Sequence, residues 1–166
     1  MFDLKTISPD AVARALIKAE RYRLLNEPGE AESICLDVLA VDPDNQEATA
    51  MLLLALTDQF VLDSSRVSDA WRTVAQLHDE YERAYYGGIV HERRAKALLA
   101  HGKPRGGSQA YEWLREAMAS YERAEMIRPP NNDDAVLRWN ACARLIVQDR
   151  HLEPAREEPR EPLLSE

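Results

Sequence analysis

A helix that stops and restarts within residues 30–47 constrains the fold most. The segment EAESICLDVLAVDPDNQE carries apolar residues at helical spacing, with acidic residues mostly on the opposite face. Pro43 ends this helix because its ring clashes with a continuing turn, and a new helix begins near Asn45. A helix with one apolar face needs a neighbour to cover that face. The segment therefore predicts an antiparallel hairpin with the helix that precedes it.

The same periodicity predicts helices along most of the chain. The expected helices span about residues 9–25, 28–42, 45–60, 65–79, 80–101, 108–128 and 132–149. The sequence has only six glycines and two phenylalanines, and it is rich in residues that lose little rotamer freedom in a helix. We therefore predict an all-α fold. The third helix is apolar on nearly every side, which predicts a place in the middle of a stack.

Polar residues with capping chemistry mark the expected helix starts. Ser8 and Ser108 each precede a helical pattern, and a serine oxygen there accepts a free backbone N–H. The boundary between the fourth and fifth helices has two candidate positions. One is Asp79, which has capping-box spacing to Glu82, and the other is the glycine pair at 87–88. We place the boundary at Asp79.

A short apolar pattern occurs three times, in the second helix of each expected pair. The first copy ends in Pro43 and the third in Pro129, whereas the second copy has no proline. The nine repeated positions are Ala31, Cys35 and Val38; Ala70, Val74 and Leu77; and Ala117, Tyr121 and Ala124. The copies lie further apart than the roughly 34 residues of an uninterrupted repeat. We assign the excess to loops at 61–65 and 102–108 and to longer fifth and sixth helices.

This pattern resembles the tetratricopeptide repeat family over residues 8–150, most clearly in AESICLDVLAVDPDN and EAMASYERAEMIRPPNN. The resemblance implies a tetratricopeptide-like stack of three antiparallel helix pairs, at about 8–42, 45–79 and 80–129. A capping helix at about 132–149 would cover the last pair. The resemblance also implies a groove, lined by the first helix of each pair, that binds a peptide or protein. A helical bundle with the same spacing by chance is the alternative fold.

The two ends of the chain lie outside this expected domain. Residues 1–7 form a short N-terminal extension in this division. Residues 151–166 are rich in proline and glutamate, and such a composition buries too little apolar surface to order itself. We therefore predict a disordered tail, unless the leucines at 163–164 dock.

Charge is distributed unevenly along the chain. The net charge is −8, and no lysine or arginine occurs between Arg23 and Arg66, whereas residues 91–105 are mainly basic. The candidate acidic surface comprises Glu27, Glu30, Glu32, Asp37 and Asp44. The acidic total disfavours nucleic acid as a partner. The asymmetry supports an alternative function, homo-oligomeric self-assembly through acidic-to-basic, head-to-tail contacts.

No complete catalytic, cofactor or metal-binding motif occurs in the sequence. The stretch from His91 to Ala95 begins like a zinc-protease helix, but alanine stands where the second histidine is needed. We expect no catalytic residues, no cofactor and no metal, and we keep an enzyme with an unrecognised site as a remote alternative. Cys35 and Cys142 fit free thiols in a cytoplasmic protein, and a disulfide between them is the alternative. The longest apolar run, residues 50–56, is too short to span a membrane.

The leading functional hypothesis is a non-catalytic adaptor that binds a peptide or protein partner. Its candidate partner-binding residues are His91, Arg93, Arg94, Trp113, Arg138 and Asn140. An arginine against packed surface needs a partner. That partner is either an acidic residue of a neighbouring helix, such as Glu112, Glu116 or one of the acidic N-terminal half, or a ligand carboxylate.

Overall fold

The computed structural model describes residues 2–102 and 106–155, and this part of the chain contains seven α-helices and no strand. The helices are α1 (Val12–Leu24), α2 (Pro28–Val41), α3 (Gln46–Asp58), α4 (Arg66–Val74), α5 (Glu80–Ala100), α6 (Gly106–Met126) and α7 (Asp134–Gln148), with a short 3-10 turn, η1 (Pro9–Ala11), before α1. The expectation of an all-α protein is confirmed.

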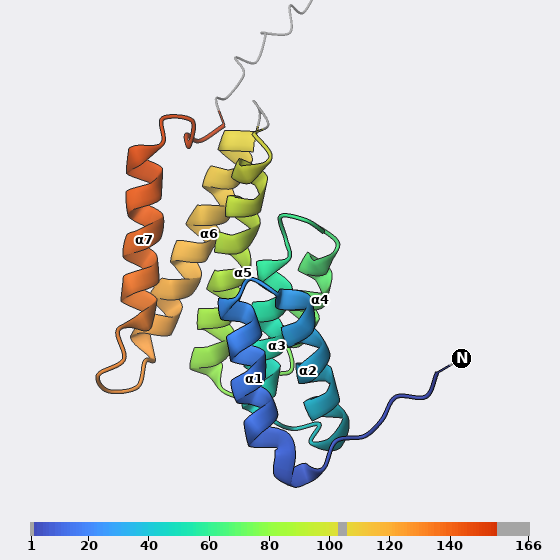
Figure 1. The fold of residues 1–166 in the computed structure, drawn as a ribbon. Coiled ribbons are helices and arrows are strands. Elements are labelled where there is room, and N and C mark those ends of the chain that lie inside the picture. The colour runs from blue at the N-terminus through green and yellow to red at the C-terminus, as the bar shows by residue number, and fades with distance from the viewer. Residues whose placement is uncertain (1, 103–105, 156–166) are drawn as a thin grey trace, which may run out of the picture.

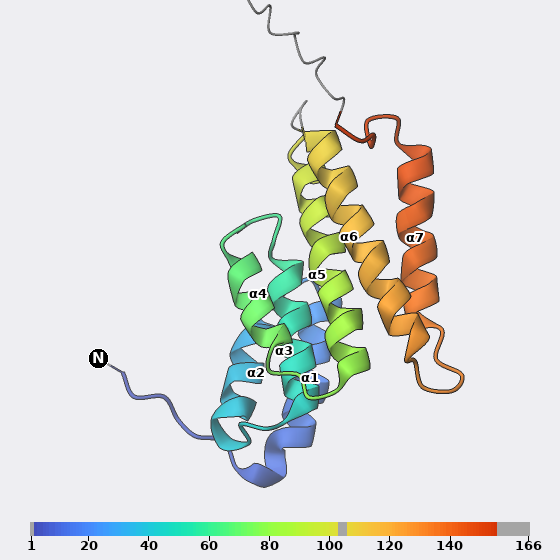
Figure 2. The same ribbon diagram turned by 180° about the vertical axis from the view of Figure 1, so that it is seen from behind.

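The helices form a layered array in which each packs against the next in the chain (Figure 1). Helix α3 lies in the middle, because it contacts α1, α2, α4 and α5. The two long helices α5 and α6 form a hairpin, and α7 runs beside α6 (Figure 2). The prediction that the third helix is covered on several sides is confirmed, since eight of its residues are buried.

The three-copy pattern marks packing positions. None of its nine residues is more than 7% exposed. Ala31, Cys35 and the second copy lie in one core cluster with α3, while the third copy lies in a second cluster around α5, α6 and α7. The small residues of the pattern are completely covered, which lets the helices approach closely.

One of the three predicted capping residues caps its helix in the structure, and the other two do not. Asp79 caps α5, and its side chain accepts the backbone N–H of Glu82 at 3.1 Å. The side chain of Ser8 makes no capping bond, so that expectation is wrong. Ser108 lies inside α6, which begins at Gly106, so Ser108 is not its cap. The fourth helix is also shorter than expected, because α4 ends at Val74.

The packed chain extends past the expected end of the domain. Leu152 is 3% exposed and belongs to the core cluster around α5, α6 and α7. A Cβ atom on Gly107 would collide with the backbone carbonyl of His151, so the segment after α7 lies directly on α6. The packed chain therefore continues past residue 150, as far as Leu152. Of the remaining expected tail, residues 153–155 are exposed, and residues 156–166 lie outside the described residues.

Candidate functional site on helix α5

Three consecutive charged residues of α5 meet three different surroundings. Successive helical residues point about 100° apart, so Glu92, Arg93 and Arg94 face different neighbours. Glu92 is fully buried, whereas Arg93 and Arg94 are half-buried. Among the described residues, Glu92 and Arg93 each have a partner of opposite charge, whereas Arg94 has none.

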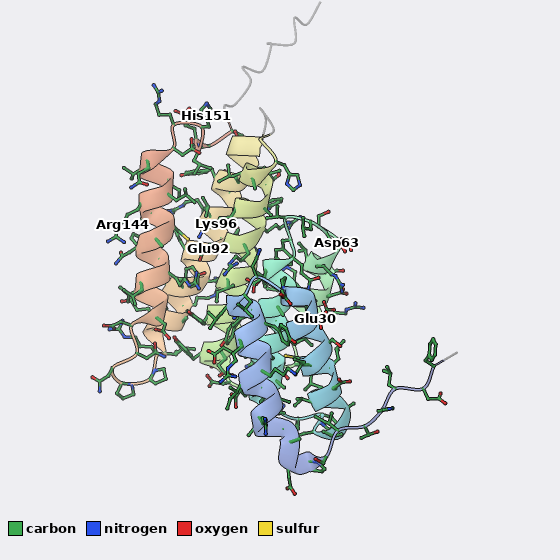
Figure 3. All side chains as sticks on the ribbon, viewed as in Figure 1. Glu30, Asp63, Glu92, Lys96, Arg144 and His151 are labelled. Carbon is green, nitrogen blue, oxygen red and sulfur yellow. The ribbon has the colours of Figure 1, made fainter. Side chains whose placement is uncertain are left out.

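Glu92 is the centre of a buried polar cluster between α5, α6 and α7 (Figure 3). Its Oε2 accepts the hydroxyl of Tyr121 at 2.6 Å, and its Oε1 lies 2.5 Å from Lys96 Nζ and 3.4 Å from Arg138 Nη1. Arg138 was a candidate for partner binding, and the structure pairs it with Glu92 instead. The sequence contains one local sign of this cluster, the i to i+4 spacing of Glu92 and Lys96.

The cluster keeps Glu92 ionised and Tyr121 protonated. Burial opposes the charge on Glu92, but hydrogen bonds from Lys96 and Tyr121 and the positive charges of Lys96 and Arg138 hold its pKa below the ordinary value of 4.5. Burial, together with the neighbouring carboxylate, raises the pKa of Tyr121 far above the ordinary value of 10.0. The hydroxyl is thus a donor to a carboxylate, which ties α6 to α5.

Arg93 lies on the side of α5 that faces α1 and α3, and it forms an ion pair there. Its Nη1 lies 2.8 Å from Oδ1 of Asp58 on α3, and the Oδ2 of Asp58 accepts Nε of Arg23 on α1 at 2.7 Å. The intramolecular alternative is therefore confirmed for Arg93, and its partner comes from the acidic N-terminal half. This pair of bonds links α1, α3 and α5.

Arg94 stacks on an aromatic ring and has no counter-ion in the described part of the chain. Its guanidinium carbon lies 3.9 Å from the centroid of the Trp113 ring on α6. Glu92 and Arg93 have partners of opposite charge, but no described carboxylate lies within ion-pair distance of Arg94. The structure thus brings together two residues that the sequence had proposed for partner binding.

Arg94 and Trp113 line a pocket of about 360 Å³, which we call the Arg94–Trp113 pocket. Its walls come from the loop between α3 and α4, from α4, from α5 and from α6. The lining residues are Phe60, Val61, Leu62, Ser64, Val67, Arg94, Ala97, Leu98, His101 and Trp113. None of them is acidic. The volume is within the range of about 300–1,000 Å³ that is usual for ligand sites.

The remaining candidates do not form one site. Asn140 is a half-buried residue of α7, away from the pocket lining. Glu27 and Glu30 are exposed. Two other acidic candidates already have partners, because Glu32 binds Arg66 at 3.0 Å and Asp44 lies 3.3 Å from His78. The last, Asp37, is half-buried beside α1.

His91 packs against α4 in a setting that disfavours its charge. Its ring lies edge-on to Trp71, with 4.9 Å between the centroids, and its buried Nδ1 has no hydrogen-bond partner among the described residues. Burial lowers the pKa of His91 below 6.5, and the nearby Glu116 only partly opposes this, while Arg94 and Arg123 add to it. The neutral ring is the form that the fold accommodates.

This setting predicts a loss of stability in mild acid. Because the unfolded chain protonates His91 more readily than the folded chain does, the free energy of unfolding should fall as the pH drops below about 6.5. His91→Gln should abolish this part of the pH dependence. Urea denaturation between roughly pH 7.5 and pH 5 measures the effect, because this range lies on both sides of the ordinary histidine pKa of about 6.5. Identical curves for wild type and His91→Gln would contradict this prediction.

Other kinds of site receive no support from the described residues. No group of three or more histidine, cysteine, aspartate or glutamate side chains is arranged to hold a metal ion in that part of the chain. Cys35 and Cys142 are buried free thiols, and burial raises the pKa of each to about 12. No helix within residues 2–102 and 106–155 has both the length and the apolar character to cross a bilayer. Comparison with models of protein families, with curated proteins and with solved structures finds no match to this chain.

Proposed function

We propose that this chain is a tetratricopeptide-like scaffold that binds a segment of a protein partner at the Arg94–Trp113 pocket. The observation that carries the proposal is an arginine stacked on a tryptophan in a pocket, with no described counter-ion. Arginine and tryptophan are enriched among the residues that dominate binding energy at protein interfaces. Every other charge at the centre of α5 is already paired within the fold.

The order of helix contacts supports the scaffold part of the proposal. Helices α1, α3 and α5 contact one another in succession, and each also packs against the helix that follows it. This is the contact order expected of stacked helix pairs, in which each pair covers a face of its neighbour. The burial of all nine repeated positions fits the same arrangement.

The proposal places the binding surface between α4, α5 and α6, and not along the groove of the first helices that the sequence suggested. On the α1, α3 and α5 side, Arg23, Asp58 and Arg93 satisfy one another. On the pocket side, Trp113 covers one face of the Arg94 guanidinium, and no described residue accepts a hydrogen bond from its in-plane N–H groups. Those N–H groups suit a carboxylate.

Affinity capture from the native host with quantitative mass spectrometry tests the proposal. Arg94→Glu reverses the charge in the pocket, and Trp113→Ala removes the stacking surface. We expect both variants to bind the same captured proteins about 30-fold more weakly or worse, the effect of losing one interface hot spot.

Arg115→Glu is the matched control. It makes the same charge reversal at an exposed position two residues from Trp113 on α6, which turns it about 200° away from that side chain. Circular dichroism melting confirms that each variant is folded. If no captured protein depends on Arg94 and Trp113, the pocket is not a partner site and the proposal is wrong.

A further inference from the structure

The N-terminal arm, residues 2–7, presents two large apolar side chains to solvent. Phe2 is 98% exposed and Leu4 is 91% exposed, and the carboxylate residue Asp3 stands between them. The last residue of the arm, Ile7, is half-buried and packs beside α1 and α2. From there towards residue 2 the arm leads away from the body of the molecule in both ribbon views (Figures 1 and 2). Covering these two side chains with another molecule would remove their apolar surface from water, which is favourable.

The chemistry of the arm complements that of the Arg94–Trp113 pocket. In an extended segment, alternate side chains point to opposite sides, so Phe2 and Leu4 share one side and Asp3 takes the other. The pocket offers apolar walls from the α3–α4 loop together with the guanidinium of Arg94. Phe2 and Leu4 match the walls, and the carboxylate of Asp3 matches the guanidinium.

The carboxylate of the α3–α4 loop does not already fill that role. Oδ1 of Asp63 accepts the backbone N–H of Ser65 at 3.0 Å and the hydroxyl of Ser65 at 2.6 Å. Its Oδ2 lies 3.5 Å from Arg66. Asp63 is therefore committed to its own loop, and within residues 2–102 and 106–155 no carboxylate neutralises Arg94.

The arm and the pocket of one molecule lie at opposite ends of the helix array. The arm precedes α1, whereas the pocket is at the loop that follows α3, and α1 and α3 run in the same direction (Figures 1 and 3). Helix α3 has 13 residues, which gives it a length of about 20 Å. Six arm residues span at most about 21 Å when fully extended. The fully extended arm is therefore only about as long as α3. It is too short to run the length of α3 and then cross to α5, so it does not reach the pocket of its own molecule.

We propose that residues 2–4 of one copy bind in the Arg94–Trp113 pocket of a second copy. The inference rests on the proposed function in taking this pocket as a binding site, and it names a second copy of the chain as the partner. Because the donor and acceptor surfaces differ, the contact is head-to-tail. Each copy in such an assembly carries one pocket and one arm. Successive contacts therefore give either a closed ring or an open chain of copies.

Sedimentation velocity over a series of protein concentrations tests the contact with two variants of the full chain. The arm variant replaces Phe2 and Leu4 with serine, and the pocket variant is Arg94→Glu. We expect wild type to form concentration-dependent oligomers, and each variant to associate at least about 30-fold more weakly, as expected for losing a hot spot. The exposure of Phe2 and Leu4 means that the arm variant keeps its fold. The matched control, Val147→Ser, removes another apolar side chain, 84% exposed, and should assemble as wild type does.

Mixing the two variants is the decisive measurement. The pocket variant still carries an intact arm, and the arm variant still carries an intact pocket. Their mixture should form a 1:1 dimer and nothing larger, since the dimer has no further functional arm or pocket to use. A monomeric wild type, an arm variant that still assembles, or a mixture that stays monomeric would each overturn the inference.

The experiment separates this inference from the proposed function. If the chain is monomeric but captured host proteins still depend on Arg94 and Trp113, the pocket binds another protein and only the second-copy inference fails. If the mixture forms the dimer but no host protein depends on the pocket, the contact with a second copy stands and the adaptor role fails.

Discussion

Gly88→Ala is expected to lower the free energy of unfolding by about 1–2 kcal/mol. A Cβ atom at position 88 would lie 2.5 Å from Cε1 of the Tyr121 ring, a distance that requires something to move. The ring is completely buried, and its hydroxyl is held by Glu92. Overpacking of this kind costs roughly 1–3 kcal/mol or more, and the gain in helix propensity returns only about 1 kcal/mol. Urea denaturation measures the change.

The neighbouring glycine provides a matched control. A Cβ atom on Gly87 would lie 3.5 Å from the Trp71 ring, which is an ordinary van der Waals contact. Both glycines lie inside α5, so Gly87→Ala brings the same gain in helix propensity without the clash. It should raise the free energy of unfolding by up to about 1 kcal/mol. Equal effects of the two substitutions would show that contact with Tyr121 does not govern position 88.

The two glycines also show how far local patterns predict this fold. A glycine pair inside a helical pattern reads as a break when only the sequence is considered, and here it lies inside a helix of 21 residues. What requires Gly88 is a tyrosine 33 positions away on another helix, and periodicity along one helix contains no information about that neighbour. The Asp79 cap was predictable because its partner, Glu82, is three residues away.

The candidate site was predictable in part, for the same reason. Helical spacing predicts that at least one of His91, Arg93 and Arg94 lies against packed surface, and Arg94 and Trp113 are both among the candidate partner-binding residues. That these two residues meet depends on the register of α5 against α6, which packing around residues such as Gly88 determines. One wall of the pocket comes from the α3–α4 loop, which precedes both Arg94 and Trp113 by many residues in the chain. The burial of Glu92 was missed because a glutamate among charged neighbours is usually solvent-exposed.

Neutralising Glu92 is expected to have the other large effect. Glu92→Gln keeps the size of the side chain and an oxygen for the Tyr121 hydroxyl, but it removes the counter-ion of Lys96 and Arg138. Removing one partner of a buried ion pair costs about 3–5 kcal/mol. The side chains of Lys96 and Arg138 are 45% and 33% exposed, so water compensates part of the loss. We expect a decrease of about 2 kcal/mol in the free energy of unfolding near neutral pH.

The dependence on pH distinguishes this role from simple packing. The pKa of Glu92 is lower in the folded chain than its ordinary value of 4.5, so its ionised form stabilises the fold above that value. This contribution disappears as the pH falls through the lower folded pKa, because protonated glutamate no longer balances Lys96 and Arg138. Urea denaturation should therefore give wild-type and Glu92→Gln curves that differ most near neutral pH and begin to converge as the pH falls below 4.5. Glu112→Gln, at an exposed position of α6, should follow wild type throughout. If the Glu92→Gln curve stays parallel to that of wild type down to acid, the loss arises from altered packing, and the charge of Glu92 does not hold α5, α6 and α7 together.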